Sequence, residues 1–330
     1  MQRSHGNGIG REHSASSRLG LDQAVVNTVA YVDVFDYPLT AREIHFYLIG
    51  VPASPDDIGS LLAKQPTLEG RIAHRNGYFT LPGREHIVDV RRERRRLADS
   101  LWPAAVAYGG RMAVLPFVRM VAVTGSLAVD NVTQDADIDY LIVTERGRLW
   151  LCRAFVILLV RLAARKGLRL CPNYFLSESA LVFPERNLYA AHELAQMVPL
   201  AGAQTYHRLL RQNRWMNQFL PNAEAPLRDL AEVRQARLGQ LLQSLGEAAL
   251  RTRPGSWLES WEMRRKIRRL RGHDAAPDEV DFCADWCKGH FEGHGQRIIS
   301  AYEARAVKAH GNGALRAGGA GASVNGVARD

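Results

Sequence analysis

Two short polar elements beside apolar runs are the part of this sequence best suited to chemistry. Gly125–Ser126 follows the apolar run Val121–Val123, and Asp137 and Asp139 introduce a second run, Tyr140–Val143. Runs rich in β-branched and aromatic residues predict buried strands. Glycine lets the backbone approach a phosphate closely because it has no Cβ, and a serine hydroxyl or the N–H groups of a following helical turn bind phosphate oxygens. The first element therefore predicts a phosphate-binding turn.

The two aspartates predict a metal site. Side chains two residues apart on a strand point to the same face, so Asp137 and Asp139 are expected side by side. Adjacent carboxylates repel each other unless a cation lies between them, and oxygen ligands of this kind suit Mg²⁺. Such an ion bridges phosphates during phosphoryl or nucleotidyl transfer. Asp135, which lies before the predicted strand, is assigned to a loop.

In this order, Gly125–Ser126 and then Asp137-Ile138-Asp139 resemble the signature of the DNA polymerase beta-like nucleotidyltransferase superfamily. The resemblance implies a mixed sheet with flanking helices, a nucleoside triphosphate substrate with ATP as the first candidate, a Mg²⁺ cofactor, and transfer of a nucleoside monophosphate to a hydroxyl. It also implies that Gly125 and Ser126 hold the triphosphate, and that Asp137 and Asp139 bind the metal and are catalytic. An acidic turn in another α/β domain is the alternative interpretation.

One departure from the family pattern concerns the third carboxylate. Members of the superfamily usually supply it from a later strand, where it helps to bind metal and can accept the proton of the attacking hydroxyl. The next predicted strand, Leu168–Leu176, carries Asn173 at that place, and an amide cannot act as a base. Glu178 is the alternative acid, although Ser177–Ser179 is also typical of a turn.

Two functions therefore stay open. The first is a Mg²⁺-dependent nucleotidyltransferase that acts on an unknown acceptor hydroxyl. The second is a non-catalytic regulator, in which a degenerate nucleotidyltransferase domain senses a nucleotide or binds DNA or a protein. The residue at position 173 is the main support for the second function, because an amide replaces the expected carboxylate.

Residues 21–86 predict three helices followed by a β-hairpin, an arrangement that resembles a winged helix. Thr40–Glu43 is a capping box, Ser54–Pro55 marks a second helix start, and Asn76–Gly77 is typical of a two-residue hairpin turn. The segment Tyr31–Thr40 also resembles the opening of bacterial proteins that join such a module to a nucleotidyltransferase domain.

DNA binding by this module is one interpretation. The helix that would enter the major groove carries Asp56 and Asp57, however, and its only basic residue is Lys64. Carboxylates disfavour contact with phosphates. We therefore favour a packing or protein-contact role.

The length of 330 residues predicts two or three domains, and the resemblance implies the fold class α+β, with a mixed sheet and flanking helices. The predicted segments are 1–20 disordered, 21–86 winged-helix-like, 87–186 nucleotidyltransferase-like core, 187–308 helical C-terminal domain, and 309–330 disordered tail. The first twenty residues are polar and unlike a signal peptide, and four cysteines suit a reducing cytoplasm, so a cytoplasmic location is expected. The most apolar segment, Phe155–Val160, is too short to span a bilayer, and no membrane span is expected.

The net charge of +9 is concentrated in two basic blocks, at 91–96 and at 264–271. Such blocks favour polyanions, namely nucleic acid, nucleotides or acidic lipid surfaces, and a solvated helix face is the alternative. Trp257 and Trp261, just before the second block, lie one helical turn apart. This spacing suits base stacking, although we favour a core contact.

Cysteine and histidine residues near the C-terminus have the types of zinc ligands. Cys283, Cys287, His290 and His294 fall on one face of a predicted helix. Four ligands on one straight helix cannot close a tetrahedron, because the outermost lie about 16 Å apart. A half-site that uses two of them with ligands from elsewhere is the alternative. The favoured interpretation is an amphipathic helix that packs Phe282, Cys283, Trp286 and Cys287 inward.

Overall fold

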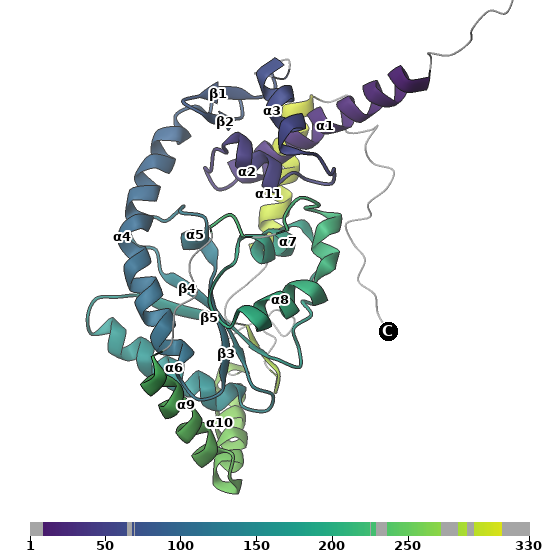
Figure 1. Ribbon diagram of the computed structural model, residues 1–330. Helices are drawn as coiled ribbons and strands as arrows, with labels where there is room; N and C mark the ends of the chain where they lie inside the picture. Colours follow the sequence, from purple (N-terminus) through teal and green to yellow (C-terminus); the bar gives the residue numbers. More distant parts are fainter. Residues whose placement is uncertain are drawn as a thin grey trace, which may run out of the picture.

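The computed structural model describes residues 9–64, 68, 70–224, 226–228, 236–271, 283–288 and 294–311 (Figure 1). Local sequence signals define its N-terminal module. The module contains α1 (Ile9–Asp33), α2 (Ala41–Phe46), α3 (Pro55–Lys64), β1 (Ala73–Arg75) and β2 (Tyr78–Thr80). Thr40 and Glu43 form the predicted capping box, which satisfies free N–H groups at the start of α2. Asn76 and Gly77 both have positive φ, as a tight hairpin turn requires. The predicted helices and hairpin are confirmed.

The ends of the chain lie partly outside the described residues. Helix α1 begins at Ile9, within the segment 1–20 for which the sequence predicts disorder, and residues 1–8 are not described. At the other end, α11 (His294–His310) extends into the predicted tail 309–330, of which residues 312–330 are not described.

A long helix, α4 (Ile87–Ala113), connects the module to a five-stranded mixed sheet (Figure 1). The strands are β3 (Val118–Val123), β4 (Ile138–Thr144), β5 (Leu170–Ser177), β6 (Val198–Ala201) and β7 (Trp286–Lys288), in the order β6-β3-β4-β5-β7. Strand β4 is antiparallel to β3 and parallel to β5. The described chain is therefore α+β with a mixed sheet, as the sequence predicts.

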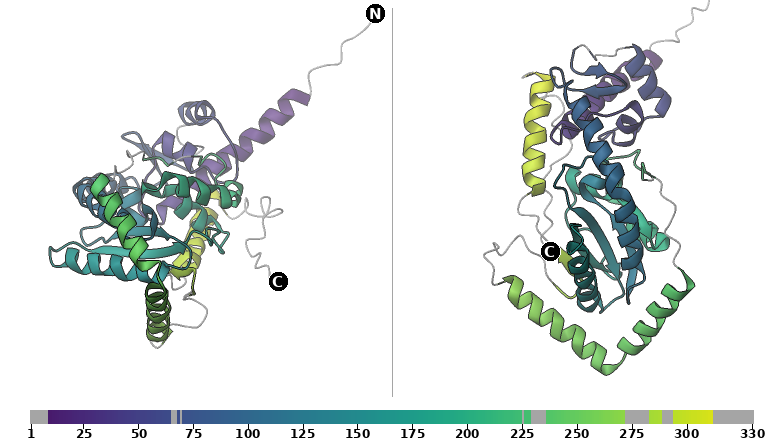
Figure 2. Two further views of the ribbon diagram at one scale, coloured as in Figure 1. Left: turned by 60° about the horizontal axis from the view of Figure 1, so that its bottom comes forward. Right: turned by 90° about the vertical axis from the view of Figure 1, so that its left-hand side faces the viewer.

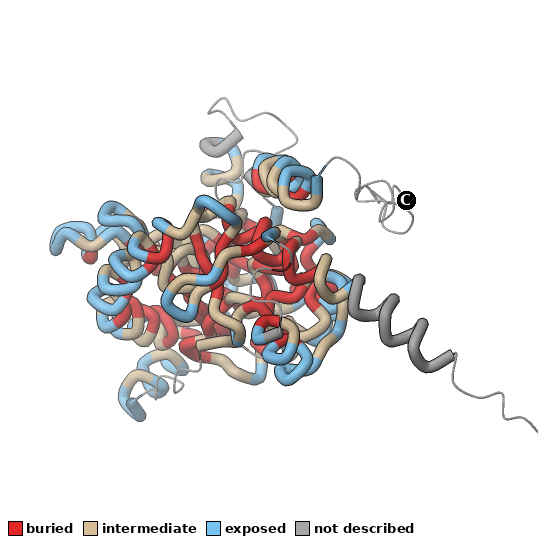
Figure 3. Tube along the Cα trace, turned by 90° about the horizontal axis from the view of Figure 1, so that it is seen from above, coloured by how far each residue is buried: buried red, intermediate tan, exposed pale blue. Residues whose placement is uncertain are grey.

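Helices cover both faces of this sheet. The remaining elements are α5 (Gly125–Ala128), α6 (Leu149–Ala164), α7 (Leu188–Gln196), α8 (Ala203–Gln212), the 3₁₀ helix η1 (Arg214–Gln218), α9 (Arg237–Leu250) and α10 (Arg253–Arg271). Alternate strand residues point to opposite faces, so Val121 and Ile142 pack with α4 and α6, while Met120 and Leu141 pack with α7 and α8. Seen from above, the buried residues gather where these layers meet (Figure 3).

The C-terminal segment 187–308, for which the sequence predicts a helical domain, also supplies both edge strands of the sheet. Strand β6 pairs with β3 and strand β7 pairs with β5. Pro199 has no N–H to donate, and an edge strand accommodates a proline for that reason. Cys287 lies in β7 and Cys283 in a bend before it, so the predicted Cys/His helix is wrong over these residues; Phe282 and His290 lie outside the described residues.

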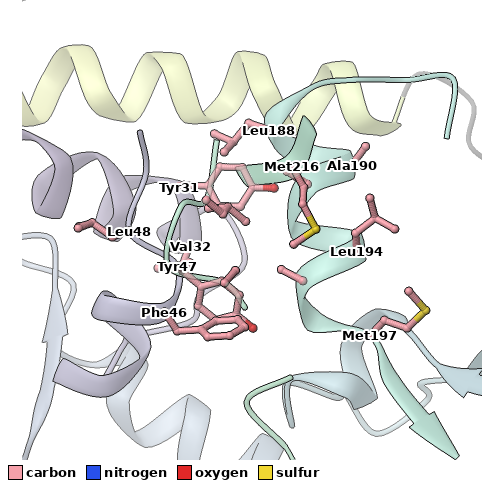
Figure 4. Packing of buried hydrophobic residues seen from close by; sticks show 14 of the residues in the cluster. Tyr31, Val32, Phe46, Tyr47, Leu48, Leu188, Ala190, Leu194, Met197 and Met216 are labelled. Carbon is pink, nitrogen blue, oxygen red and sulfur yellow. The ribbon is translucent and has the colours of Figure 1, made fainter. Parts of the chain in front are cut away.

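The N-terminal module shares its core with one face of the sheet. Tyr31 and Tyr47 point toward α7, where Leu188 and Leu194 lie opposite (Figure 4). The two parts are also joined by an ion pair, in which the buried Arg91 of α4 donates to Glu43 of α2. Two residues of the first basic block are therefore used within the protein, since the half-buried Arg94 of α4 likewise donates to the carbonyl of Phe35.

Within the described part of the chain, none of the helices combines the length and the apolar character needed to cross a bilayer.

Candidate functional site

The predicted phosphate-binding turn lies directly against the predicted metal-binding strand. The N–H of Thr124 donates to the carbonyl of Asp139 (3.1 Å), which continues the β3–β4 ladder by one residue. Gly125 follows with φ +63°, and a Cβ at this position would lie 2.3 Å from Oδ2 of Asp139. Only glycine fits this turn without displacing the carboxylate. The structure thus brings Gly125, Ser126 and Asp139 together.

Asp139 is held in a desolvated setting. Burial raises the pKa of its carboxyl to about 6, a hydrogen bond with Cys171 acts in the opposite direction, and the charge of Asp137 raises the pKa further. Asp137 itself is exposed just before β4 begins. The two carboxylates are therefore close enough to interact, with one at the rim and one in the interior. Asp135 is exposed and paired with Arg169.

Asn173, the predicted third-strand residue, does reach the site. Between the pairs Asp139–Cys171 and Leu141–Tyr174, β5 has one residue more than β4, which is the signature of a β-bulge. Nδ2 of Asn173 donates to Oδ1 of Asp139 (3.3 Å). Its other polar atom, Oδ1, is buried without a hydrogen-bond partner, so the amide has one acceptor free for a ligand.

Glu178, the alternative third acid, does not belong to the site. Its N–H donates to the carbonyl of Thr144, at the opposite end of β4 from Asp139. Thr144 lies five positions after Asp139 along the strand, or roughly 16 Å away at the usual rise. The side chain of Glu178 instead faces Arg208 (3.6 Å). Parallel pairing of β4 and β5 is the reason, because it carries later residues of β5 away from Asp139.

The structure supplies another acid, Glu193 of α7, which sequence reasoning missed. Burial raises the pKa of Glu193 to about 7, and the charge of Asp139 acts in the same direction. Nothing in the local sequence signals this role, because Glu193 lies in an amphipathic helix well after the strands. His192, the residue before it, is also buried in the structure, so this part of α7 turns polar side chains toward the interior.

Asp139 and Glu193 line a cavity of about 410 Å³ between the sheet and the N-terminal module. The walls on the module side are aromatic, from Tyr31, Phe35, Tyr37 and Tyr47. The cavity therefore combines carboxylates at one end with flat apolar rings at the other. Such a mixture suits a ligand with a charged part and an aromatic part.

His192 is an unusual member of the aromatic wall. Its ring stacks on Tyr31 (ring centroids 4.0 Å apart) and on Tyr47 (5.4 Å). Burial lowers its pKa to about 4, so the ring is neutral at pH 7. Nδ1 donates to the carbonyl of Leu188 (3.0 Å), and Nε2 is buried without a partner. A neutral ring with this tautomer offers Nε2 as an acceptor.

A second cavity of about 230 Å³ adjoins the first, and Asn173, Tyr189 and Glu193 line both. Lys288 of β7 and Glu185, which form an ion pair, lie on its far wall. Glu193 of α7 therefore lines both cavities.

The described side chains do not by themselves form a complete metal-coordination site. Among the described residues, no three His, Cys, Asp or Glu side chains converge so as to hold an ion. All four cysteines are free, including Cys171 beside Asp139. In comparisons with known proteins, the chain matches no protein-family model, no curated protein and no solved structure.

Proposed function

We propose that this protein is a nucleotidyltransferase-type enzyme that transfers a nucleoside monophosphate from a nucleoside triphosphate to an acceptor hydroxyl. The close approach of Gly125 to Asp139, at the mouth of an aromatic-walled cavity, carries the proposal. A turn without a Cβ admits phosphate oxygens beside a carboxylate that can share a metal with them. The two antiparallel strands fix both groups on rigid backbone.

The residues present fit Mg²⁺. Mg²⁺ is usually held by one or two carboxylates together with substrate phosphates, so a pair of aspartates without a third protein ligand is sufficient for binding. Asp137 and Asp139 would hold the ion, and the free Oδ1 of Asn173 is a further oxygen. When bound, Mg²⁺ neutralises charge on the triphosphate and on the leaving pyrophosphate.

The other residues have separate roles in this proposal. Ser126 and the backbone of Gly125 bind the triphosphate. Tyr31, Tyr47 and His192 form the wall for the nucleobase, and Nε2 of His192 accepts a hydrogen bond from it; an exocyclic amine such as that of adenine suits this acceptor. Glu193 accepts the proton of the attacking hydroxyl, because its raised pKa lies near neutral pH.

The proposed function includes a winged-helix-like N-terminal module with a packing role. An isolated antiparallel β-bridge between Leu39 and Phe79 joins the segment before α2 to the hairpin. On α3, Asp56 and Asp57 are exposed, a poor surface for DNA phosphates. The aromatic residues of this module instead complete the cavity, so its contribution is to close the nucleotide site.

The second candidate is a regulator that binds a nucleotide without transferring it. Asn173 favours it, because the amide beside Asp139 stands where the resemblance leads us to expect a third carboxylate. Both candidates require nucleotide binding, and only the first requires turnover. The acid on α7 supports the enzyme, since an enzyme needs a proton acceptor and a sensor does not.

Calorimetry tests nucleotide binding. Wild-type protein should bind MgATP or another Mg²⁺–triphosphate, and Asp137→Ala/Asp139→Ala should lose Mg²⁺-dependent binding. Asp135→Ala is the matched control, because this exposed aspartate pairs with Arg169 away from the cavity. Equal binding by wild type and the double variant would sink the proposal. Incorporation of labelled nucleotide into a cell extract then separates the enzyme from the regulator.

A further inference from the structure

Helix α9 packs with its polar and small residues inward. Nε2 of Gln243 donates to the carbonyl of Leu115 (3.0 Å), and Oε1 of the buried Glu247 accepts from the N–H of Phe117 (2.9 Å). Gly239 and Gly246 also face the protein, since a Cβ on them would lie 2.8 Å from Val114 and 2.9 Å from Pro116. The face of an ordinary surface helix that packs inward is apolar, so this helix is inverted.

The consequence is an exposed row of leucines on the other side of α9. Leu238, Leu241, Leu242 and Leu245 follow the spacing of one helical face and are each more than half exposed, from 55% to 66%. Seven of the eleven large hydrophobic side chains that are exposed in the described chain lie on α9 and α10. An apolar concentration of this kind marks an interaction surface.

Helix α10 adds aromatic and basic residues. Trp257 and Trp261 are 60% and 44% exposed, so the predicted core contact is wrong for both. Their rings stack on each other (centroids 6.3 Å apart, interplanar angle 16°), and the guanidinium of Arg265 lies over Trp261 (5.1 Å). Helical spacing places Arg264 and Arg268, both exposed, on the same stripe as the two rings.

The charge exposed on these two helices has one sign. The only acidic residues of α9 and α10 are Glu247, Glu259 and Glu262, and all three are buried. Glu259 accepts from the N–H groups of Trp150 and Leu151, and Glu262 pairs with Arg265. The exposed charged residues there are arginines, among them Arg237, Arg253, Arg264 and Arg268.

This combination selects among partners. Two copies joined through this surface would bring arginines against arginines, which is repulsive. Single-stranded nucleic acid would use the arginines and the Trp pair but would leave the leucine row against a polar backbone. An anionic bilayer uses all three, because leucines enter the acyl boundary, tryptophans lie at the interface and arginines contact headgroups.

We propose that α9 and α10 form a peripheral membrane-binding surface that docks the protein on anionic lipid headgroups. The surface consists of Leu238, Leu241, Leu242 and Leu245 on α9 and of Trp257, Trp261, Arg264 and Arg268 on α10. It lies at the end of the molecule opposite the N-terminal module (Figure 1; Figure 2, right). Docking at this end leaves the cavity beside the module open to its ligands.

Vesicle flotation with the full chain tests the proposal. Vesicles of phosphatidylcholine with phosphatidylserine should carry the protein, and vesicles of phosphatidylcholine alone should not. Arg264→Ala/Arg268→Ala should weaken binding about thirtyfold, since each arginine near the surface contributes about 1 kcal/mol. Arg211→Ala/Arg214→Ala removes the same charge from exposed positions outside the surface and should bind as wild type.

Two further variants address the apolar component. Leu241→Gln/Leu245→Gln should weaken binding at least about tenfold, because two exposed leucines no longer enter the lipid. Trp257→Phe/Trp261→Phe should retain binding but lose most of the fluorescence quenching by brominated phosphatidylcholine within anionic vesicles. Circular dichroism and thermal unfolding of each variant confirm that it is folded before it is compared.

Three outcomes would overturn the proposal. The first is flotation that does not depend on anionic lipid, or flotation that neither the arginine variant nor the leucine variant weakens. The second is tight binding of a single-stranded oligonucleotide that the arginine and tryptophan variants abolish while vesicles are not bound. The third is a dimer in sedimentation velocity that Leu241→Gln/Leu245→Gln converts to monomer, again without vesicle binding.

Discussion

A Cβ placed on Gly125 would lie 2.3 Å from Oδ2 of Asp139, so the turn after β3 and the carboxylate of β4 are fitted to each other. The turn therefore leaves no room for a side chain between its backbone and this carboxylate. The segment between the two residues is longer than a tight turn, yet pairing of β3 with β4 holds them next to each other.

Gly125→Ala should therefore damage the site more than the fold. Positive φ costs a non-glycine residue about 1–2 kcal/mol, and the new Cβ also displaces the carboxylate of Asp139. We expect a loss of about 2 kcal/mol in urea unfolding and a fall of at least about tenfold in MgATP affinity by calorimetry. Gly147→Ala is the control, because Gly147 has φ +69° with no atom within 4 Å of its Cβ position. It should lose stability and keep affinity.

Binding of Mg²⁺ and a triphosphate should release protons. At pH 7 the carboxyl of Glu193, with its pKa raised to about 7 by burial and by Asp139, is about half protonated, and a cation beside it favours the ionised form. Calorimetry in buffers with different ionisation enthalpies measures this release. Glu193→Gln should reduce it by up to about half a proton and should preserve nucleotide binding. Unchanged proton release in this variant would argue against a place for Glu193 at the site.

The ion pair between Glu43 and Arg91 should stabilise the joint between the N-terminal module and α4. Burial raises the pKa of Glu43, but hydrogen bonds from Arg91 and Thr40 outweigh it, so the pKa is held below its ordinary value of 4.5. A depressed carboxyl pKa contributes stability above pH 4.5, and this stability is lost as the pH falls through the folded-state pKa.

Glu43→Gln should lower the free energy of unfolding by about 3 kcal/mol at pH 7, because it leaves the buried Arg91 without its counter-charge. The difference from wild type should shrink in urea titrations below pH 4.5. Glu93→Gln breaks the exposed pair with Arg96 and should change stability by less than about 0.5 kcal/mol. Similar losses in both variants would contradict a special role for the buried pair.

His192 should make the fold sensitive to mild acid. Burial lowers its pKa from 6.5 to about 4, so between these values the unfolded chain binds a proton that the folded chain does not. The free energy of unfolding is therefore unaffected by His192 above pH 6.5. Below it, this free energy falls by about 1.4 kcal/mol per pH unit down to pH 4, about 3 kcal/mol in total. Nitrogen-15 NMR of the imidazole should show no titration near pH 6.5. His192→Phe, which keeps a ring between Tyr31 and Tyr47, should flatten this part of the pH profile.

Local elements were predicted well from the sequence. The Thr40–Glu43 cap, the Asn76–Gly77 turn and the strands on either side of Asp137 all depend on steric and hydrogen-bonding rules that act within a few residues. The same is true of Gly125, whose need for glycine is signalled by its position after a strand. These features require no knowledge of the rest of the chain.

Pairing between distant segments was not predictable in this way. Strands β6 and β7 are short, and their backbones become strands only because β3 and β5 offer free edges. Glu178 was a reasonable candidate by spacing, yet the parallel register of β4 and β5 carries it to the wrong end of the sheet. Register is a property of two strands together, and one sequence segment does not encode it.

The sequence by itself therefore determined which residues could approach a phosphate and a metal, because backbone freedom and carboxylate chemistry are local. Only the tertiary structure decided that Glu193 faces Asp139, that the aromatic residues of the N-terminal module close the cavity, and that the leucines of α9 face outward. Each of these depends on which face of a helix is buried. That choice is made by the surface against which the helix packs, and an amphipathic pattern alone does not identify that surface.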